Sequence, residues 1–232
     1  HLWAAPLRRA LARAGARPDV LVLTEPFDLV LAGRLGEARA AYYVFDETDL
    51  MPGPRVLRRA QNRAEAQDLG RVAVVFASSM AQAERRRGAH PRVVPLLNGV
   101  SPQRYAPSGD LPEDLARIPR PRLLVCGQID FRLDPELLQA LADRHPEWSL
   151  VLVGPVRASG EPVARRLAGK RNVHFLGHRD PSRLAAYQEG CDVGLVPFVQ
   201  DDVTRAMRPL RALAYLSSGL PVVSVPLPEL VP

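Results

Sequence analysis

The stretch from Asn172 to Pro226 reads NVHFLGHRDPSRLAAYQEGCDVGLVPFVQDDVTRAMRPLRALAYLSSGLPVVSVP and decides the fold. Its segments NVHFLG, DVGLVPF and PVVSVP are apolar and have the length of β-strands, whereas SRLAAYQEG and RAMRPLRALAYLSSG have helical patterns. Strands whose apolar residues run continuously, rather than alternating, are typical of a parallel sheet covered by helices on both faces. The stretch therefore predicts an α/β domain in which strands and helices follow one another.

The same alternation extends over the rest of the chain. Further strand-like runs occupy residues 19–25, 41–46, 72–78, 92–100, 122–127 and 149–154. The rhythm breaks at residues 101–121, which contain five prolines. We predict a partial N-terminal domain over residues 1–104, a Pro-rich linker over 105–121 and a partial C-terminal domain over 122–232. Two Rossmann-like parallel-sheet domains would face a cleft, where such sheets bind ligands at the carboxyl ends of their strands.

Composition narrows the classes of function. The chain has a net charge of +6, and nearly all of its cations are arginines, which suit bidentate contacts with phosphate. This charge fits an anionic ligand or an anionic membrane surface. We expect no nucleic acid partner, because basic and aromatic residues are not interleaved. The two cysteines, Cys126 and Cys191, form no CxxC motif, which indicates buried free thiols and a cytoplasmic location.

The strongest candidate site is the loop over residues 200–204 together with the basic residues after it. Arg205, Arg208 and Arg211 follow at three-residue spacing, which would place them on adjoining parts of one helix face. Cations near a helix N-terminus oppose the helix dipole, and a bound diphosphate would reverse that penalty. The alternative is that Asp201, Asp202 or Thr204 caps the helix and the aspartates neutralise the arginines. The pattern leaves both interpretations open.

Two further places carry candidate residues. Arg132 follows a strand that ends at Gly127, where a glycine would let the backbone approach a ligand; the alternative is a turn with a solvated arginine. Asp46, Glu47 and Asp49 end a strand and could orient an acceptor hydroxyl or move a proton, although capping and turn formation would use the same residues.

Several familiar site motifs are absent from the sequence. His174 and His178 lie four apart on a strand and the turn after it, a spacing that suits metal binding only on a helix. The sequence has no GxGxxG, no P-loop and no GxSxG motif. We therefore predict no metal site.

Three segments support a resemblance to a known family. The stretches VVFASSMAQAERRR, VVPLLNGVSPQRYAP and TRAMRPLRALAYLSSGLPVVSVPLPE resemble GT-B glycosyltransferases of family 4, especially bacterial members that build surface polysaccharides. The matched features run across nearly the whole chain. The last stretch is the most specific, because the family usually reads there T-R-x-x-S-P-x-K-x-x-E-Y, followed by a Gly-Pro turn.

The resemblance implies a retaining transferase that uses a nucleotide-sugar donor and no metal or other cofactor. The donor would bind the C-terminal domain, and a cell-surface glycan or lipid-linked acceptor would bind the N-terminal domain, with peripheral contact to a membrane. By position, Arg132 and Arg211 match the family's phosphate-binding residues, Arg205 matches the arginine before the helix, and Asp46 matches an acidic residue of the first domain. The residues expected to line the donor cleft are Gly127, Gly154, Thr204 and Tyr215.

The sequence also departs from the family's pattern. Ala214 stands where the family has a Glu that hydrogen-bonds the donor ribose, and losing that contact should cost roughly 1–3 kcal/mol. Arg208 replaces a small Ser, and Phe131 replaces a residue that is often acidic. The family has further segments at both ends, so the resemblance implies a chain incomplete at both termini. The alternative is a non-catalytic GT-B-like nucleotide-binding or scaffold protein; a GT-B epimerase would need paired acids and a His that the sequence does not bring together.

Overall fold

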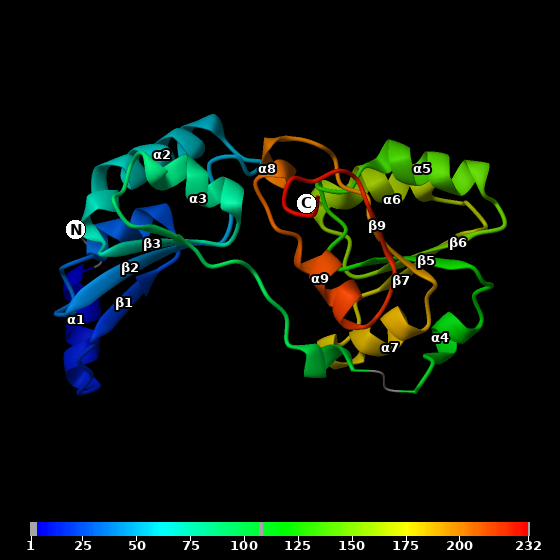
Figure 1. Ribbon diagram of the computed structural model, residues 1–232, viewed down its shortest axis with the longest axis horizontal. Coiled ribbons are helices and arrows are strands. Elements are labelled where there is room, and N and C mark those ends of the chain that lie inside the picture. Colours follow the sequence, from blue (N-terminus) through cyan, green and yellow to red (C-terminus); the bar gives the residue numbers. More distant parts are fainter. Residues whose placement is uncertain (1–3, 107–108, 232) are drawn as a thin grey trace. The chain divides into compact units, whose positions relative to one another are not determined.

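The computed structural model describes residues 4–106 and 109–231, which form two units that are considered separately (Figure 1). The first unit extends to Asn98 and includes Arg205–Arg208; the second comprises Gly99–Thr204 and Pro209–Val231. Each unit contains one parallel sheet with helices packed on it. The predicted class, two α/β domains built on parallel sheets, is confirmed.

The first unit is built on a four-stranded sheet with the order β1-β2-β3-β4. A buried cluster that includes Leu29, Tyr42, Val44 and Val75 forms its core. The elements are α1 (Ala4–Arg13), β1 (Val20–Leu23), the 3-10 helix η1 (Pro26–Leu31), β2 (Arg39–Val44), α2 (Arg55–Asp68), the 3-10 helix η2 (Leu69–Arg71), β3 (Val74–Ala77), α3 (Met80–Arg87) and β4 (Val93–Pro95).

Helices α2 and α3 lie over one face of this first sheet (Figure 1). On the other face, Val20 and Val22 of β1 are 58% and 59% exposed, and Phe45 after β2 is 49% exposed. The expectation that continuous apolarity buries both faces is therefore wrong for β1, whereas three successive residues of β2, Ala40, Ala41 and Tyr42, are buried. The apolar run of β1 reads like a doubly buried strand, but in the described residues only its core-facing side is covered.

The second unit has a five-stranded sheet with the order β7-β6-β5-β8-β9. Its elements begin with the 3-10 helix η3 (Pro102–Tyr105), α4 (Glu113–Ala116), β5 (Arg122–Cys126), α5 (Pro135–Arg144), β6 (Ser149–Val153), the 3-10 helix η4 (Ala158–Gly160) and α6 (Glu161–Leu167). They continue with β7 (Val173–Gly177), the 3-10 helix η5 (Pro181–Arg183), α7 (Leu184–Glu189), β8 (Val193–Val196), α8 (Asp202–Arg205), α9 (Leu210–Ser217) and β9 (Val222–Ser224).

The central strands of the second sheet are buried on both faces, as predicted. Every residue of β5 and β6 is buried, with Leu124, Val125, Val151 and Leu152 at 0% exposure. Helices α5 and α6 lie on one side of this sheet and α4 and α7 on the other (Figure 1). Cys126 and Cys191 are buried free thiols, as the sequence predicted.

The predicted linker differs from the structure. Residues from Gly99 onward belong to the second unit, and the segment contains the short helix α4. Leu115 and Ile118 are 0% and 6% exposed, so the segment packs onto the unit instead of spanning a gap. Its prolines fix extended turns around α4, which explains why it reads as a linker. Pro107 and Ser108, inside the predicted linker, lie outside the described residues.

The helix predicted across residues 205–219 is divided in two. Helix α8 ends at Arg205, and α9 begins at Leu210 after Pro209, whose ψ of 114° is extended. Proline supplies no N–H for a helical hydrogen bond and disfavours helical geometry in the residue before it. Arg205, Arg208 and Arg211 therefore do not share one helix face, and the prediction that their spacing places them together is wrong.

Candidate functional site

Two glycines shape the end of the second sheet at which its parallel strands have their carboxyl ends, here called the carboxyl edge. Gly127 follows β5 with φ at 115°, and Gly154 follows β6 with φ at 148°, a region that other residues rarely adopt. A Cβ atom on Gly154 would lie 1.9 Å from the carbonyl oxygen of Gly127. The two backbones are thus in direct contact, and the amide of Gly127 donates to the carbonyl of Val153 at 2.8 Å. Gly154 is buried beneath Gly127, so it supports the edge and does not line an open cleft, contrary to its predicted place.

Arg211, the second residue of α9, reaches this edge. Its guanidinium lies against Gly127, where an added Cβ atom would meet Nη2 at 3.2 Å. Nη2 donates to the carbonyl of Gln128 at 3.1 Å, and the guanidinium carbon lies 5.2 Å from the centre of the Phe198 ring. Gly127 therefore allows the chain after β5 to pass directly beside a cation, as expected from its place at the end of a strand.

The positive charge of Arg211 is incompletely satisfied. Its Nη1 atom is buried and has no hydrogen-bond partner among the described residues. Burial lowers the pKa of the Arg211 guanidinium, with repulsion from Arg132 acting in the same direction. A half-buried guanidinium group with one buried, unpartnered nitrogen and no paired carboxylate is costly unless something else supplies charge or acceptors. An anion at the carboxyl edge of the sheet would supply both.

Arg132 lies on the same side of the second unit but is already paired. Its Nε lies 2.9 and 3.1 Å from the two carboxylate oxygens of Asp130, and Nη2 also donates to that carboxylate. Asp130 is 4% exposed, and the guanidinium carbon of Arg132 lies 6.0 Å from the Phe198 ring centre. The interpretation of Arg132 as a solvated residue is therefore wrong, since a buried carboxylate holds it next to the aromatic ring that Arg211 also approaches.

Phe198 and Asp130 are site residues that the sequence reasoning missed. Phe198 ends the run DVGLVPF at the carboxyl edge, which is a signal that could have identified it. Two backbone hydrogen bonds join the segment that follows Asp130 to the segment that contains Phe198. Val199 donates its N–H to the carbonyl of Arg132 at 2.8 Å, and Asp134 donates its N–H to the carbonyl of Pro197 at 2.8 Å. The position of Arg132 is thus fixed by backbone pairing, which favours a preorganised site.

Thr204 does not line a cleft. It is 0% exposed, its Oγ1 donates to the carbonyl of Val199, and its N–H donates to the Asp201 carboxylate at 2.9 Å. The N–H of Asp201 in turn donates to Thr204 Oγ1 at 3.2 Å. This reciprocal pair is the capping alternative that the sequence left open, so the predicted cleft role of Thr204 is corrected.

Tyr215 is also a buried residue and not a cleft residue. It is 0% exposed; its hydroxyl accepts from the N–H of Cys126 at 2.7 Å and donates to the carbonyl of Leu124 at 3.3 Å. Burial raises the pKa of Tyr215, so the phenol keeps the proton that it donates. A Cβ atom on Gly194 would lie 2.4 Å from the Tyr215 ring, so that glycine makes room for it. Tyr215 therefore fixes the end of β5 just before Gly127.

Replacing Tyr215 by Phe is expected to lower the free energy of unfolding by about 1–3 kcal/mol, because it leaves the buried N–H of Cys126 without an acceptor. Denaturant unfolding measures this change. Tyr43→Phe is the control, since the Tyr43 hydroxyl makes only an exposed bond with the carbonyl of Leu96 at 3.3 Å. A loss no greater than that of the control would show that the hydroxyl does not hold the end of β5.

The remaining predicted residues lie in the first unit. Arg205 is exposed and belongs with this unit, so the site built above consists of Arg132 and Arg211 with Phe198. Asp46 is exposed just after β2, but its neighbours are fixed. The carbonyl of Phe45 accepts from Ser78 Oγ at 2.8 Å and from Gln82 Nε2 at 3.2 Å.

Glu47 is 3% exposed and forms part of a buried ion cluster. Arg86 of α3 is 4% exposed and donates to both oxygens of Glu47, at 2.7 and 2.9 Å, and to those of Glu65 at 2.8 and 3.0 Å. Burial by itself would lower the pKa of Arg86, but these hydrogen bonds outweigh it and raise the pKa. Arg85 pairs with Glu47 and Asp49. Of the three acids, only Asp46 is left pointing to solvent, so Glu47 and Asp49 have structural roles.

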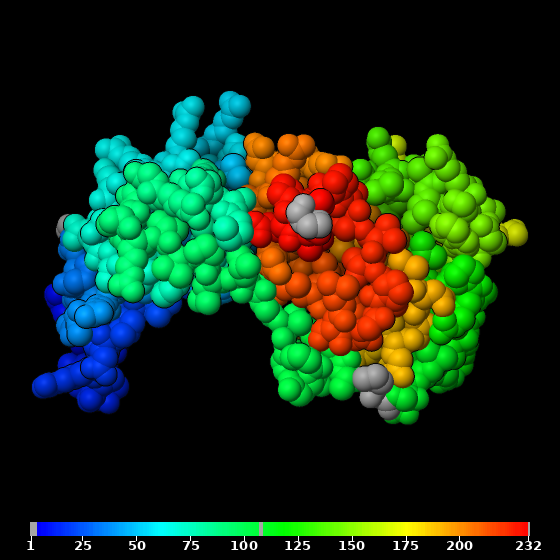
Figure 2. All heavy atoms as spheres, viewed as in Figure 1, coloured from blue at the N-terminus to red at the C-terminus, as the bar shows by residue number. Residues whose placement is uncertain are grey.

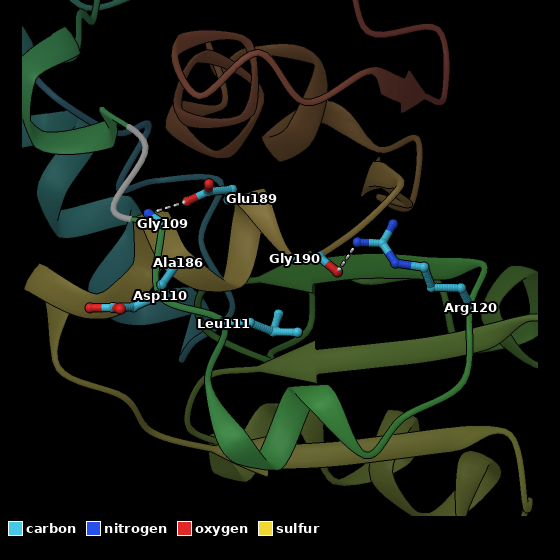
Figure 3. A pocket seen from close by; sticks show the side chains of 7 residues that line it. All are labelled: Gly109, Asp110, Leu111, Arg120, Ala186, Glu189 and Gly190. Atoms are coloured by element: carbon cyan, nitrogen blue, oxygen red, sulfur yellow. Dashed lines mark hydrogen bonds between the residues drawn. The ribbon is translucent and has the colours of Figure 1, made fainter.

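A small cavity lies at the other end of the second sheet, near the amino ends of β5 and β8 (Figure 3). Its volume is about 180 Å³. Arg120 Nη2 donates to the carbonyl of Gly190 at 3.2 Å, and Glu189 accepts from the N–H of Gly109 at 3.2 Å. The lining comprises Gly109, Asp110, Leu111, Arg120, Ala186, Glu189 and Gly190. The cavity lies at the other end of the strands and is separate from the Arg211 site. Within residues 4–106 and 109–231, no group of three His, Cys, Asp or Glu side chains is placed to hold a metal ion.

Comparisons with known proteins show what the chain is similar to. Residues 121–232 match the family model described as glycosyl transferases group 1. The chain is 32% identical over 103 residues to TuaH of Bacillus subtilis (strain 168), assigned as a teichuronic acid biosynthesis glycosyltransferase; the match covers 44% of this chain and 26% of TuaH. The resemblance to glycosyltransferases stated from the sequence is confirmed.

Solved structures show the same fold. Sucrose-phosphate synthase from Thermosynechococcus elongatus superposes with a TM-score of 0.73 at 18% identity, over 96% of this chain and 59% of that protein. The Anabaena protein Alr3699/HepE, solved in complex with UDP, gives a TM-score of 0.64 at 18% identity, over 95% of this chain and 62% of that protein. Two parallel-sheet α/β units of the GT-B type are therefore established, and the chain spans less than two thirds of the proteins that it matches.

Proposed function

Taking the glycosyl transferases group 1 match of residues 121–232 as the premise, we propose that this chain is part of a glycosyltransferase with a nucleotide-sugar donor. The second unit would bind the donor, with its diphosphate at Arg211 and Arg132. The first unit would carry the acceptor, with Asp46 near the reacting hydroxyl.

The observation that carries this proposal is the state of Arg211. The guanidinium of Arg211 lies against a glycine turn at the carboxyl ends of the strands of a parallel sheet, with Nη2 beside Gly127. Its other terminal nitrogen, Nη1, is buried without a hydrogen-bond partner, and no carboxylate pairs with the guanidinium among the described residues. Ligands of open α/β sheets bind at the carboxyl edge. A diphosphate would give Arg211 charge-assisted hydrogen bonds and would lie near the first turn of α9, where helix N–H groups point outward.

The proposed reaction breaks the bond between the sugar's anomeric carbon and the diphosphate oxygen, and it forms a bond from that carbon to the oxygen of an acceptor hydroxyl, whose proton passes to the departing diphosphate. Negative charge grows on the departing diphosphate, and preorganised cations at that position lower the barrier most. Arg211 and the backbone-held Arg132 would supply that charge without a metal. Retention of anomeric configuration is part of the proposal.

The assigned role of TuaH supports a cell-surface glycan or lipid-linked acceptor. A cytoplasmic enzyme in peripheral contact with a membrane would fit such an acceptor. No helix in the described part of the chain has the length and apolarity needed to cross a bilayer.

A second candidate is a non-catalytic nucleotide-binding or scaffold protein. Two observations favour it: Ala214, one turn after Arg211, is 7% exposed and offers no polar group to a ribose, and Asp130 already occupies Arg132. In this case the GT-B fold would be retained while donor binding is weak.

A thermal-shift screen with UDP, GDP, CDP, ADP and dTDP at millimolar concentration distinguishes the two. A ligand that binds only the folded chain raises its stability by RT ln(1 + [L]/Kd), so a site with a Kd a hundred times below the ligand concentration adds about 2.7 kcal/mol. We expect a rise with one nucleoside diphosphate and little with its nucleoside. No rise with any of the five, in a chain that melts cooperatively, would favour the non-catalytic protein.

A further inference from the structure

Helix α2 of the first unit has a cationic outer side that nothing in the described structure neutralises. Its first ten residues, Arg55–Ala64, contain four arginines and no Asp or Glu. Arg55, Arg59 and Arg63 are exposed and follow at intervals of four, so they form a line along one side of the helix, about 12 Å long. None of the three has an acidic side chain within 4 Å among the described residues.

The acids of α2 are engaged elsewhere. Glu65 lies on the inner side and pairs with Arg86 at 2.8 Å, and Asp68 pairs with Arg71. Arginines at i and i+4 repel one another, so a helix that keeps three in a row gives up some stability in the free protein. Most solvated helix faces mix the two signs of charge, and this face does not.

An apolar side chain stands beside the arginines. Val56 is 75% exposed, the highest value among the large hydrophobic side chains of the described residues. It lies seven residues, or two helical turns, before Arg63 and so shares the side that carries the three arginines. Figure 2 shows the start of α2, in light blue, as an uncovered part of the first unit from which side chains project.

We propose that the outer side of α2, formed by Arg55, Val56, Arg59 and Arg63, docks on an anionic lipid surface. Such a surface uses both features at once: its head groups attract arginines, each contributing on the order of fivefold in binding, and its interface accepts an exposed apolar side chain. A soluble polyanion would use the arginines and gain nothing from Val56. The inference specifies the membrane contact of the proposed function, but it does not depend on the donor site.

Sedimentation with lipid vesicles tests this surface. The chain is expected to bind vesicles that contain phosphatidylglycerol and to ignore vesicles of phosphatidylcholine alone. The variant Arg55→Gln/Arg59→Gln/Arg63→Gln should bind roughly 100-fold more weakly, from three arginines at about fivefold each. Glutamine is a good helix former, so α2 should be retained. Its response to UDP should equal that of the unaltered chain, which separates this test from that of the donor site.

Two control variants test whether vesicle binding depends on the outer side of α2. The variant Arg157→Gln/Arg171→Gln/Arg183→Gln removes the same charge from exposed arginines of the second unit and should bind vesicles nearly as well as the unaltered chain. Val56→Gln should weaken vesicle binding several-fold but leave binding to soluble polyphosphate unchanged. Equal losses from both triple variants would show unspecific charge attraction and overturn the proposal. Unchanged vesicle binding by Val56→Gln would overturn it in favour of a soluble polyanion.

Discussion

Replacing Arg211 by Met is expected to raise the melting temperature of the free chain while weakening binding of a nucleoside diphosphate by roughly 100-fold or more. The two effects have one cause. The guanidinium is half-buried, and its buried Nη1 has no partner among the described residues, so the free protein carries a desolvation cost that an anion would remove. Methionine has similar length, fills the space against Phe198 and leaves no polar atom unsatisfied.

The magnitudes follow from general values. Replacing a buried ionic group by a well-packed apolar side chain is commonly neutral or stabilising, by about 1–2 kcal/mol here. Losing charge-assisted hydrogen bonds to a diphosphate costs roughly 1.5–3 kcal/mol for each bond, so two bonds amount to a factor of 100 or more. Binding is measured by calorimetry and stability by thermal unfolding, each without and with ligand.

The matched control is Arg171→Met, at an exposed arginine of the same unit. It removes the same charge without touching the carboxyl edge of the sheet and should change neither quantity much. If Arg211→Met melted lower than the unaltered chain and still bound the nucleotide, Arg211 would be a packing residue and not an anion ligand.

Replacing Arg86 by Met is expected to destabilise the first unit by about 3–5 kcal/mol. Arg86 is the only group bonded to both Glu47 and Glu65 within the described residues, and removing it leaves a carboxylate at 3% exposure with one half-exposed partner, Arg85. For a domain of about 100 residues, such a loss lowers the melting temperature by roughly 10 °C or more. Differential scanning calorimetry measures it, and hydrogen exchange at β2 and α3 assigns it to this unit.

The neighbouring residue supplies the control. Arg87 pairs with Glu84 on the surface, with side chains 53% and 70% exposed, so Arg87→Met should cost less than about 1 kcal/mol. The double variant Glu47→Met/Arg86→Met should recover part of the loss, because it removes the orphaned charge as well. A small effect of Arg86→Met alone would mean that water reaches Glu47 and that the cluster does not hold the residues on either side of Asp46.

The sequence predicted the strands well because their signal is local. All nine apolar runs overlap a strand, and the site glycine, Gly127, lies where a strand-end glycine was expected. Arg211 was assigned by resemblance, and the structure adds that its charge is unsatisfied. The break between α8 and α9 could have been predicted from Pro209, since a proline in the middle of a helical pattern interrupts the helix.

Other features depend on contacts between distant residues and have no local signal. Tyr215 reaches the end of β5, 89 residues away in the chain, so its burial could not be seen from its place on α9. The pairing of Arg132 with Asp130 competes with the role that the resemblance gave to Arg132, and a spacing of two residues does not reveal it. The exposure of Val20 and Val22 in β1 also has no local signal, because apolarity shows that a strand can be buried but not what covers it.

Calorimetric titration of the chain with UDP, uridine and inorganic diphosphate tests the central claim most directly. If the half-buried guanidinium of Arg211 holds the diphosphate, UDP and inorganic diphosphate should compete for one site, uridine should bind far more weakly, and Arg211→Met should abolish the heat of both anions. Binding of uridine as tight as that of UDP, or diphosphate binding that survives in Arg211→Met, would contradict the assignment of this site.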